Sequence, residues 1–220
     1  MSDQSARTRS AAGPRWTRRR LLAALSACYG AGASADQPDI AAVAAGFGVT
    51  AGTVRRWLAG DSGRGRPRIP ERRLRELQVP PALVLENEQM VADNARRVVE
   101  GLRLPRGRDR VRQQDWLEPH LVAVIELPAD AGGIRLRQIS MTRGTPKQVD
   151  RLQRRGGLVD FTTVPSRYHA IALINDVMTL VGPWRLYPGE NVTRDSRTQT
   201  WAHDAPAFNI ASLAVALDPE

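Results

Sequence analysis

Apolar positions between residues 36 and 60 predict two short helices joined by a tight turn. The side chains that recur at helical spacing and are expected to face the core are Ile40, Val43, Ala44, Phe47, Val54, Trp57 and Leu58. Asp36 is the expected N-cap of the first helix, with Pro38 in its first turn. Gly48 supplies the positive φ of the turn, and Thr50 is the expected N-cap of the second helix. Two crossed helices joined in this way form a helix-turn-helix.

The remaining face of the second helix carries the candidate chemistry. Arg55 and Arg56 lie on it, and the planar arginine fork matches guanine O6 and N7 in the major groove. Gly52 is unfavourable in a helix by about 1 kcal/mol relative to alanine, and close approach to DNA is one explanation for it. The candidate DNA-binding residues of the helix and of the glycine-rich loop after it are Thr50, Ala51, Gly52, Thr53, Arg55, Arg56, Arg64, Arg66 and Arg68. The loop is either an arm on the DNA backbone or a solvated linker.

The segment before this pair has two interpretations. A helix from about Thr17 to Tyr29 would pack on the helix-turn-helix through Leu21, Leu22, Leu25 and Tyr29. Alternatively, the basic residues 18–20, the apolar run and Leu25-Ser-Ala-Cys28 resemble a lipoprotein signal peptide. The packed helix is favoured because the apolar run is at the short limit for a signal. No segment has the length of a membrane span.

Two further helices are expected before the pattern changes. Residues 69–77 predict a helix that closes the small domain, and Pro80-Pro81 follows it. A longer helix spans about 82–102, with valines at 84, 91 and 98 that would either dimerise or, the favoured interpretation, pack on the C-terminal domain. A basic linker, residues 104–112, comes next.

The C-terminal part shows alternating strand patterns and two or three helices. Strands are expected at 121–127, 134–140 and 158–164, a turn at 128–133, and helices at 146–155 and 166–181, followed by an apolar run at 210–217. The residues of the 166–181 helix expected to be buried are Tyr168, Ile171, Ala172, Val177 and Leu180. The order β-β-α-β-α predicts an α+β domain.

The domain expectation is therefore a basic disordered tail at 1–14, a helix-turn-helix domain at 15–78, a linker helix and basic linker at 79–112, and an α+β domain at 113–220. The last domain is expected to dimerise or to bind a ligand or partner.

The N-terminal and C-terminal parts of the chain differ in net charge. The chain has 31 arginines and one lysine, Lys147, and a net charge of +9. Residues 1–78 contain 14 Arg against 6 Asp and Glu, whereas residues 79–220 contain 18 Arg and Lys against 17 acidic residues. Positive charge gathered around the helix-turn-helix is the electrostatic pattern of a phosphate-binding domain. Double-stranded DNA is the expected partner, with the N-terminal arginines and the loop anchoring its backbone.

Catalytic signals are lacking. Cys28 is the one cysteine, and the three histidines, which are far apart in sequence, are interpreted as structural or surface groups. His169 and Tyr168 would make a base and a hydroxyl, but helix packing explains the tyrosine. Residues 193–200 either contact phosphate through Arg194 and Arg197 or, the favoured interpretation, form an exposed loop or edge strand. A non-enzymatic protein with no cofactor and no metal is expected.

Ala44, Gly48, Val49 and the run from Thr50 to Trp57 resemble the helix-turn-helix family of phage repressors and bacterial regulators. The resemblance covers residues 36–60, or Trp16 to Leu77 if these form one domain. It implies a homodimeric transcriptional regulator of a phage, plasmid or bacterial genome, cytoplasmic and nucleoid-associated. A weaker resemblance, carried by Arg56-Trp57-Leu58, Arg66-Pro67-Arg68 and Asp115-Trp116, is to terminal proteins of actinobacterial linear replicons. It implies replication priming from a protein hydroxyl, and no such hydroxyl can be named here.

Overall fold

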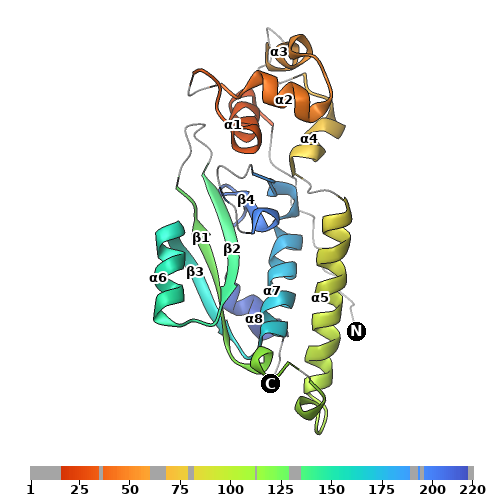
Figure 1. Ribbon diagram of the computed structural model, residues 1–220, viewed down its shortest axis with the longest axis vertical. Helices are drawn as coiled ribbons and strands as arrows, with labels where there is room; N and C mark the ends of the chain where they lie inside the picture. Colours follow the sequence, from red (N-terminus) through yellow and green to blue (C-terminus); the bar gives the residue numbers. More distant parts are fainter. Residues whose placement is uncertain are drawn as a thin grey trace, which may run out of the picture.

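The computed structural model describes residues 16–34, 37–59, 68–78, 82–111, 113–128, 135–188, 193 and 196–217. A group of helices from the N-terminal part lies at one end of an elongated molecule, and a sheet with its covering helices forms the rest (Figure 1). The expected α+β fold is confirmed. The tail 1–14, the loop around Arg64 and Arg66, and most of the turn expected at 128–133 lie outside the described residues.

Four helices make the N-terminal unit: α1 (Arg18–Tyr29), α2 (Ile40–Phe47), α3 (Ala51–Ala59) and α4 (Glu71–Gln78). The predicted packing of the first helix is confirmed, because Leu21 and Leu25 are fully buried against α2 and α3, and Leu22 and Tyr29 are partly buried there. The core residues of this unit are Leu21, Leu25, Val43, Ala44, Phe47, Val54, Trp57, Leu58, Ile69 and Leu77.

The opposite side of α1 contacts the C-terminal part. Its alanines 23, 24 and 27 pack against Ile125, Leu136 and Leu186 in a second small core. The amide of Tyr187 also donates to the carbonyl oxygen of Leu77 at the end of α4, over 3.1 Å. The helix that resembles a signal peptide is thus buried on two sides, between the helical unit and the sheet.

The N-cap of α2 differs from the prediction. Asp39 caps this helix, since its Oδ1 accepts from the amides of Ala41 and Ala42 at 2.9 and 3.0 Å. The prediction of Asp36 as the cap is wrong, and Asp36 itself lies outside the described residues. An isolated bridge pairs Pro38 with Ala31, and the helix begins only after it, later than the sequence indicated.

Gly46 is required by the packing of α1 on α2. A Cβ at position 46 would lie 2.3 Å from Cε1 of Tyr29. That ring is held by Phe47, with centroids 5.4 Å apart, and burial raises the pKa of the Tyr29 hydroxyl to about 12. The ring has therefore limited freedom to move away from an added methyl group.

Replacing Gly46 with alanine is expected to lower the free energy of unfolding by about 1–3 kcal/mol through overpacking. Gly52→Ala is the matched control, because a Cβ there meets nothing closer than Thr50 Oγ1 at 3.8 Å. Helix propensity should raise the stability of that variant by up to about 1 kcal/mol. Urea unfolding followed by circular dichroism measures both, and equal stabilities for the two variants would contradict the clash with Tyr29.

The C-terminal sheet has four antiparallel strands in the order β3-β1-β2-β4. The first three, β1 (His120–Glu126), β2 (Leu136–Thr142) and β3 (Gly157–Val164), confirm the predicted strands. The fourth, β4 (Thr200–Ala202), pairs with β2 at residues 136–138 only. Three residues are too few to show a period of two, and the sequence therefore did not separate β4 from the polar segment before it.

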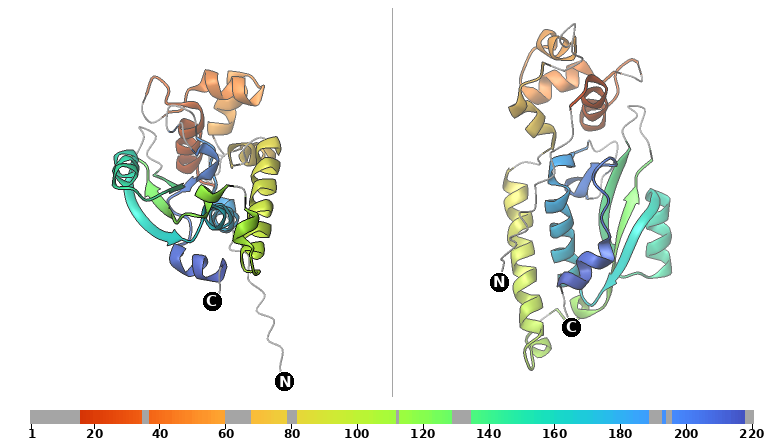
Figure 2. Two further views of the ribbon diagram at one scale, coloured as in Figure 1. Left: turned by 60° about the horizontal axis from the view of Figure 1, so that its bottom comes forward. Right: turned by 180° about the vertical axis from the view of Figure 1, so that it is seen from behind.

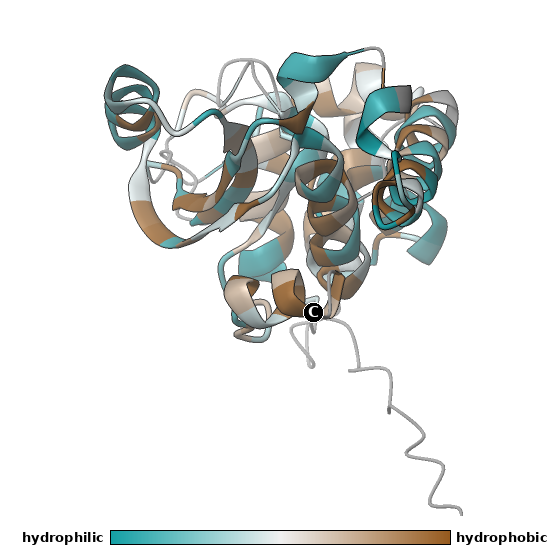
Figure 3. Ribbon diagram, turned by 90° about the horizontal axis from the view of Figure 1, so that it is seen from below, coloured by the Kyte–Doolittle hydropathy of each residue, from teal (hydrophilic) through white to brown (hydrophobic). Residues whose placement is uncertain are grey.

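Helices cover both faces of the sheet. α7 (Arg167–Leu180) and α8 (Ile210–Leu217) pack on the face of Val122, Val124 and Ile139, whereas α6 (Pro146–Arg155) lies on the other face (Figure 2). Apolar residues of the sheet and α7 pack in one core. The ribbon of α6 is coloured largely hydrophilic (Figure 3). The expectation that Leu180 is buried is wrong: it is 52% exposed in the last turn of α7, and Val181 is buried instead.

Helix α5 (Ala82–Leu102) packs along α7. The predicted packing of this helix on the C-terminal domain is therefore confirmed. The contact is made mainly by Ala92, Ala95 and Val99. Of the predicted stripe, Val98 is partly buried beside them, whereas Val91 is 41% exposed. Arg96 adds hydrogen bonds to Asn175 and Asp176 of α7 at 2.7 and 2.6 Å. A straight helix has 3.6 residues per turn, so a seven-residue stripe drifts around it, and the small alanines allow close approach.

Candidate nucleic-acid interface

The turn between α2 and α3 has the predicted local geometry. Gly48 adopts φ 61° and ψ 40°, in the left-handed region that favours glycine. The amide of Val49 donates to the carbonyl oxygen of Ala44 at 2.9 Å. Thr50 Oγ1 accepts from the amide of Thr53 at 3.2 Å and so caps α3. These bonds set the direction in which α3 leaves α2.

The inner face of α3 is anchored in the core. Val54, Trp57 and Leu58 are buried, as predicted from their spacing. The rings of Trp57 and Phe47 meet edge to face, with centroids 5.8 Å apart and an interplanar angle of 82°. The helix therefore presents its other face from a rigid support.

The outer face of α3 is polar and exposed. Gly52, Arg55 and Arg56 are exposed, and Thr53 is half-buried. Arg56 Nη2 donates to Thr53 Oγ1 at 3.2 Å, so this arginine lies back along its own helix. Within the part of the chain that the structure describes, Arg55 makes no hydrogen bond or ion pair. Arg55 is thus the side chain on this face that is fully available to a ligand.

The outer face of α3 also points away from the rest of the molecule. Figure 1 shows α3 at the end farthest from the sheet, with α1 between the two. Helix α3 packs on α2 and α1. A long partner such as a DNA duplex can approach this end without meeting the sheet or its helices.

The basic loop begins and ends beside α3. The chain leaves the helix at Ala59, and the amide of Arg68 donates to the carbonyl oxygen of Trp57 at 3.1 Å. Arg68 is exposed, as a phosphate contact requires, whereas the predicted contacts Arg64 and Arg66 lie outside the described residues. Ala59 and Arg68, which flank the segment predicted to form this loop, therefore both lie next to the C-terminal end of the helix predicted to read DNA.

Several arginines expected to contact phosphate are engaged within the protein. Arg18 Nε donates to the carbonyl oxygen of Leu58 at 2.9 Å, at the end of α3. Arg20 pairs with Asp204 and lies over the Trp16 ring. Arg197 donates to the carbonyl oxygen of Pro188 at 2.8 Å and stacks on Tyr187, and Arg194 lies outside the described residues. Arg18 is a support for α3 that the sequence pattern did not distinguish from its neighbours.

The tyrosine and histidine at the start of α7 are both buried. His169 Nδ1 lies 2.7 Å from Ser166 Oγ, the N-cap of the helix. Tyr168 packs on Trp116 with centroids 5.4 Å apart, and burial raises the pKa of its hydroxyl. Among the residues described, no group of histidine, cysteine and carboxylate side chains is arranged to hold a metal ion.

No protein-family model, no curated protein and no solved structure matches this chain. In the parts that the structure describes, none of the helices has the length and apolar character needed to cross a bilayer.

Proposed function

We propose that this chain binds double-stranded DNA by inserting α3 into the major groove and acts as a transcriptional regulator. The observation that carries the proposal is the outer face of α3, where Arg55 is exposed and unengaged on a helix whose inner face is buried. A recognition helix follows a tight turn, is rigidly supported by the core and presents cationic side chains that have no role inside the protein. Helix α3 and Arg55 are arranged in this way.

Each part of this surface has a distinct role in the proposal. Arg55 and Arg56 read guanine edges through bidentate hydrogen bonds. Gly52 lets the helix backbone come close to the base pairs, since it has no side chain and the nearest atom to a Cβ there would be Thr50 Oγ1 at 3.8 Å. Arg68 and the loop before it hold the phosphate backbone, which positions the helix but carries no sequence information.

We further propose that two copies bind together at the nucleoid of a phage-, plasmid- or bacterium-derived genome. Dimeric helix-turn-helix proteins place their recognition helices one helical turn of DNA apart, about 10 base pairs from centre to centre. The DNA site is then a palindrome with half-sites at that spacing.

Selection of bound sequences from a random duplex library tests the proposal. Enrichment of a palindrome is expected, and strong binding without enrichment would contradict sequence-specific regulation.

Raising salt from 50 to 200 mM should weaken DNA binding steeply, by about 10³–10⁵-fold if about 6–10 phosphates are neutralised. A flat salt response would contradict the DNA-binding proposal itself.

A further inference from the structure

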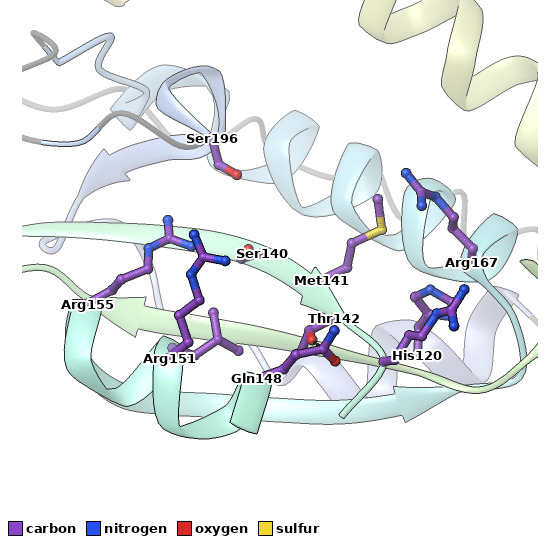
Figure 4. A pocket seen from close by; sticks show the side chains of 11 residues that line it. His120, Ser140, Met141, Thr142, Gln148, Arg151, Arg155, Arg167 and Ser196 are labelled. Carbon is purple, nitrogen blue, oxygen red and sulfur yellow. Dashed lines mark hydrogen bonds between the residues drawn. The ribbon is translucent and has the colours of Figure 1, made fainter. Parts of the chain in front are cut away.

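A polar cavity lies where one edge of the sheet is left open. β4 covers the edge of β2 at residues 136–138 only, and the next residues of β2, from Ser140 to Thr142, border a cavity of about 490 Å³ (Figure 4). Helix α6 forms one wall, and the first turn of α7 and Ser196 lie on the other side. The cavity is on the sheet, remote from α3.

Four arginines from three separate segments line this cavity. Arg143 follows β2, Arg151 and Arg155 lie one turn apart on α6, and Arg167 begins α7. None of the described lining residues is acidic. Figure 4 shows Arg151 and Arg155 extending from α6 over the open edge of β2, with Arg167 at the far end. The sequence showed a basic helix but could not show that these residues converge.

Only one of the four charges is balanced by a carboxylate among the described residues: Arg143 pairs with Asp115 at 3.0 Å. Arg155 donates to the neutral amide oxygen Oε1 of Gln138. Arg151, Arg155 and Arg167 make no ion pair with any described residue.

Arg167 gives an independent sign of a missing partner. Its guanidinium stacks over the Trp116 ring at 4.3 Å, and its Nε is buried without a hydrogen-bond acceptor. A buried donor without an acceptor is unfavourable by about 1–3 kcal/mol.

Neutral groups add further donors on the cavity wall. Thr142 Oγ1 donates to Gln148 Oε1 at 2.7 Å, which leaves the Gln148 amide nitrogen free to donate to a ligand. Guanidinium and amide donors gathered in this way suit the oxygens of a phosphate, which accepts several charge-assisted hydrogen bonds at once.

A second cavity, lined by both apolar and polar side chains, adjoins the first. It has a volume of about 560 Å³, lies between α5 and α7, and shares Met141 and Arg167 with the arginine cavity. Its lining includes Trp116, Ile171 and Met178. Both volumes fall in the range of about 300–1,000 Å³ that is typical of small-molecule sites.

We propose that the two cavities bind one small organic phosphate, with its phosphate among the arginines and its apolar portion between α5 and α7. Arg151 and Arg167 supply the charge for the phosphate, and Trp116 and Ile171 contact the apolar portion. The proposal does not depend on DNA binding, because the site uses residues of α5 and of the C-terminal part and none of α3.

Calorimetric titration of the full chain with hexyl phosphate and with inorganic phosphate tests both halves of the site. Hexyl phosphate is expected to bind more tightly, by about fourfold for each methylene that becomes buried. Arg151→Gln should weaken both ligands by about tenfold or more, since it removes a charge-assisted contact. Arg151 is exposed and unpaired among the described residues, so this variant should fold normally.

Arg154→Gln is the matched control, because Arg154 is exposed on the same helix and does not line the cavity. Its affinities should stay within twofold of those of the original chain. An equal loss in both variants would overturn the proposal, as would no binding of either phosphate at millimolar concentration. Equal affinity for the two phosphates would overturn the apolar half. Weaker DNA binding by Arg151→Gln without phosphate binding would assign the arginines to nucleic acid and also overturn it.

Discussion

Replacing Trp57 with alanine is expected to lower the free energy of unfolding by about 3–5 kcal/mol, as for other buried aromatic side chains. Trp57 is 9% exposed and fills the core between α2 and α3, where its ring meets Phe47 edge to face. A small helical unit has few other large side chains to compensate for its loss. The same change should abolish DNA binding, because α3 loses its support.

Chemical denaturation followed by far-ultraviolet circular dichroism measures this effect, and a gel-shift assay follows DNA binding. Trp57→Phe is the graded control: it keeps an aromatic ring against Phe47 and should lose much less stability. Unfolding of the alanine variant at the same denaturant concentration as the original chain would show that Trp57 does not anchor α3.

Replacing Arg55 with alanine is expected to weaken binding to the selected DNA site by about 1–3 kcal/mol, roughly 5- to 150-fold. Arg55 is exposed and makes no contact with the described residues that would be lost in the free protein. The stability of the variant should therefore change by no more than about 0.5 kcal/mol, as is usual for surface positions. The expected loss is thus confined to the complex with DNA.

Fluorescence anisotropy with the selected duplex and with a scrambled duplex separates the possible roles of Arg55. A base contact predicts a loss on the selected site and little change on the scrambled one. Arg154→Ala, which removes the same charge from α6, should bind both duplexes like the original chain. Equal losses on both duplexes would instead identify Arg55 as a phosphate contact and contradict base reading.

The helices and strands that could be predicted are those whose signals are local. The positive φ at Gly48, the cap at Thr50 and the spacing of Val54, Trp57 and Leu58 lie within a dozen residues of one another. The alternation in β1, β2 and β3 is equally local, and Gly156 ends α6 where expected. Each of these features is decided by backbone sterics or by one amphipathic face.

The predictions that failed depended on distant partners. Asp39 caps α2 because Ala31 pairs with Pro38, which the sequence around Asp36 does not reveal. Packing against α7 decided which face of α5 is buried, and Asn175 and Asp176 of α7 also accept hydrogen bonds from Arg96. β4 exists because Thr200 and its neighbours pair with β2, about sixty residues earlier in the chain.

For this protein, the sequence alone determined the α+β class, most of the helices and strands, and the placement of Arg55 and Arg56 on the outer face of α3. It did so because helical periodicity and capping act within a few residues. Only the tertiary structure decided that Arg55 is unengaged while Arg18 and Arg20 are used internally. It alone brought Arg143, Arg151, Arg155 and Arg167 to one cavity. Which charges remain available to a ligand depends on long-range packing, and local pattern does not encode that packing.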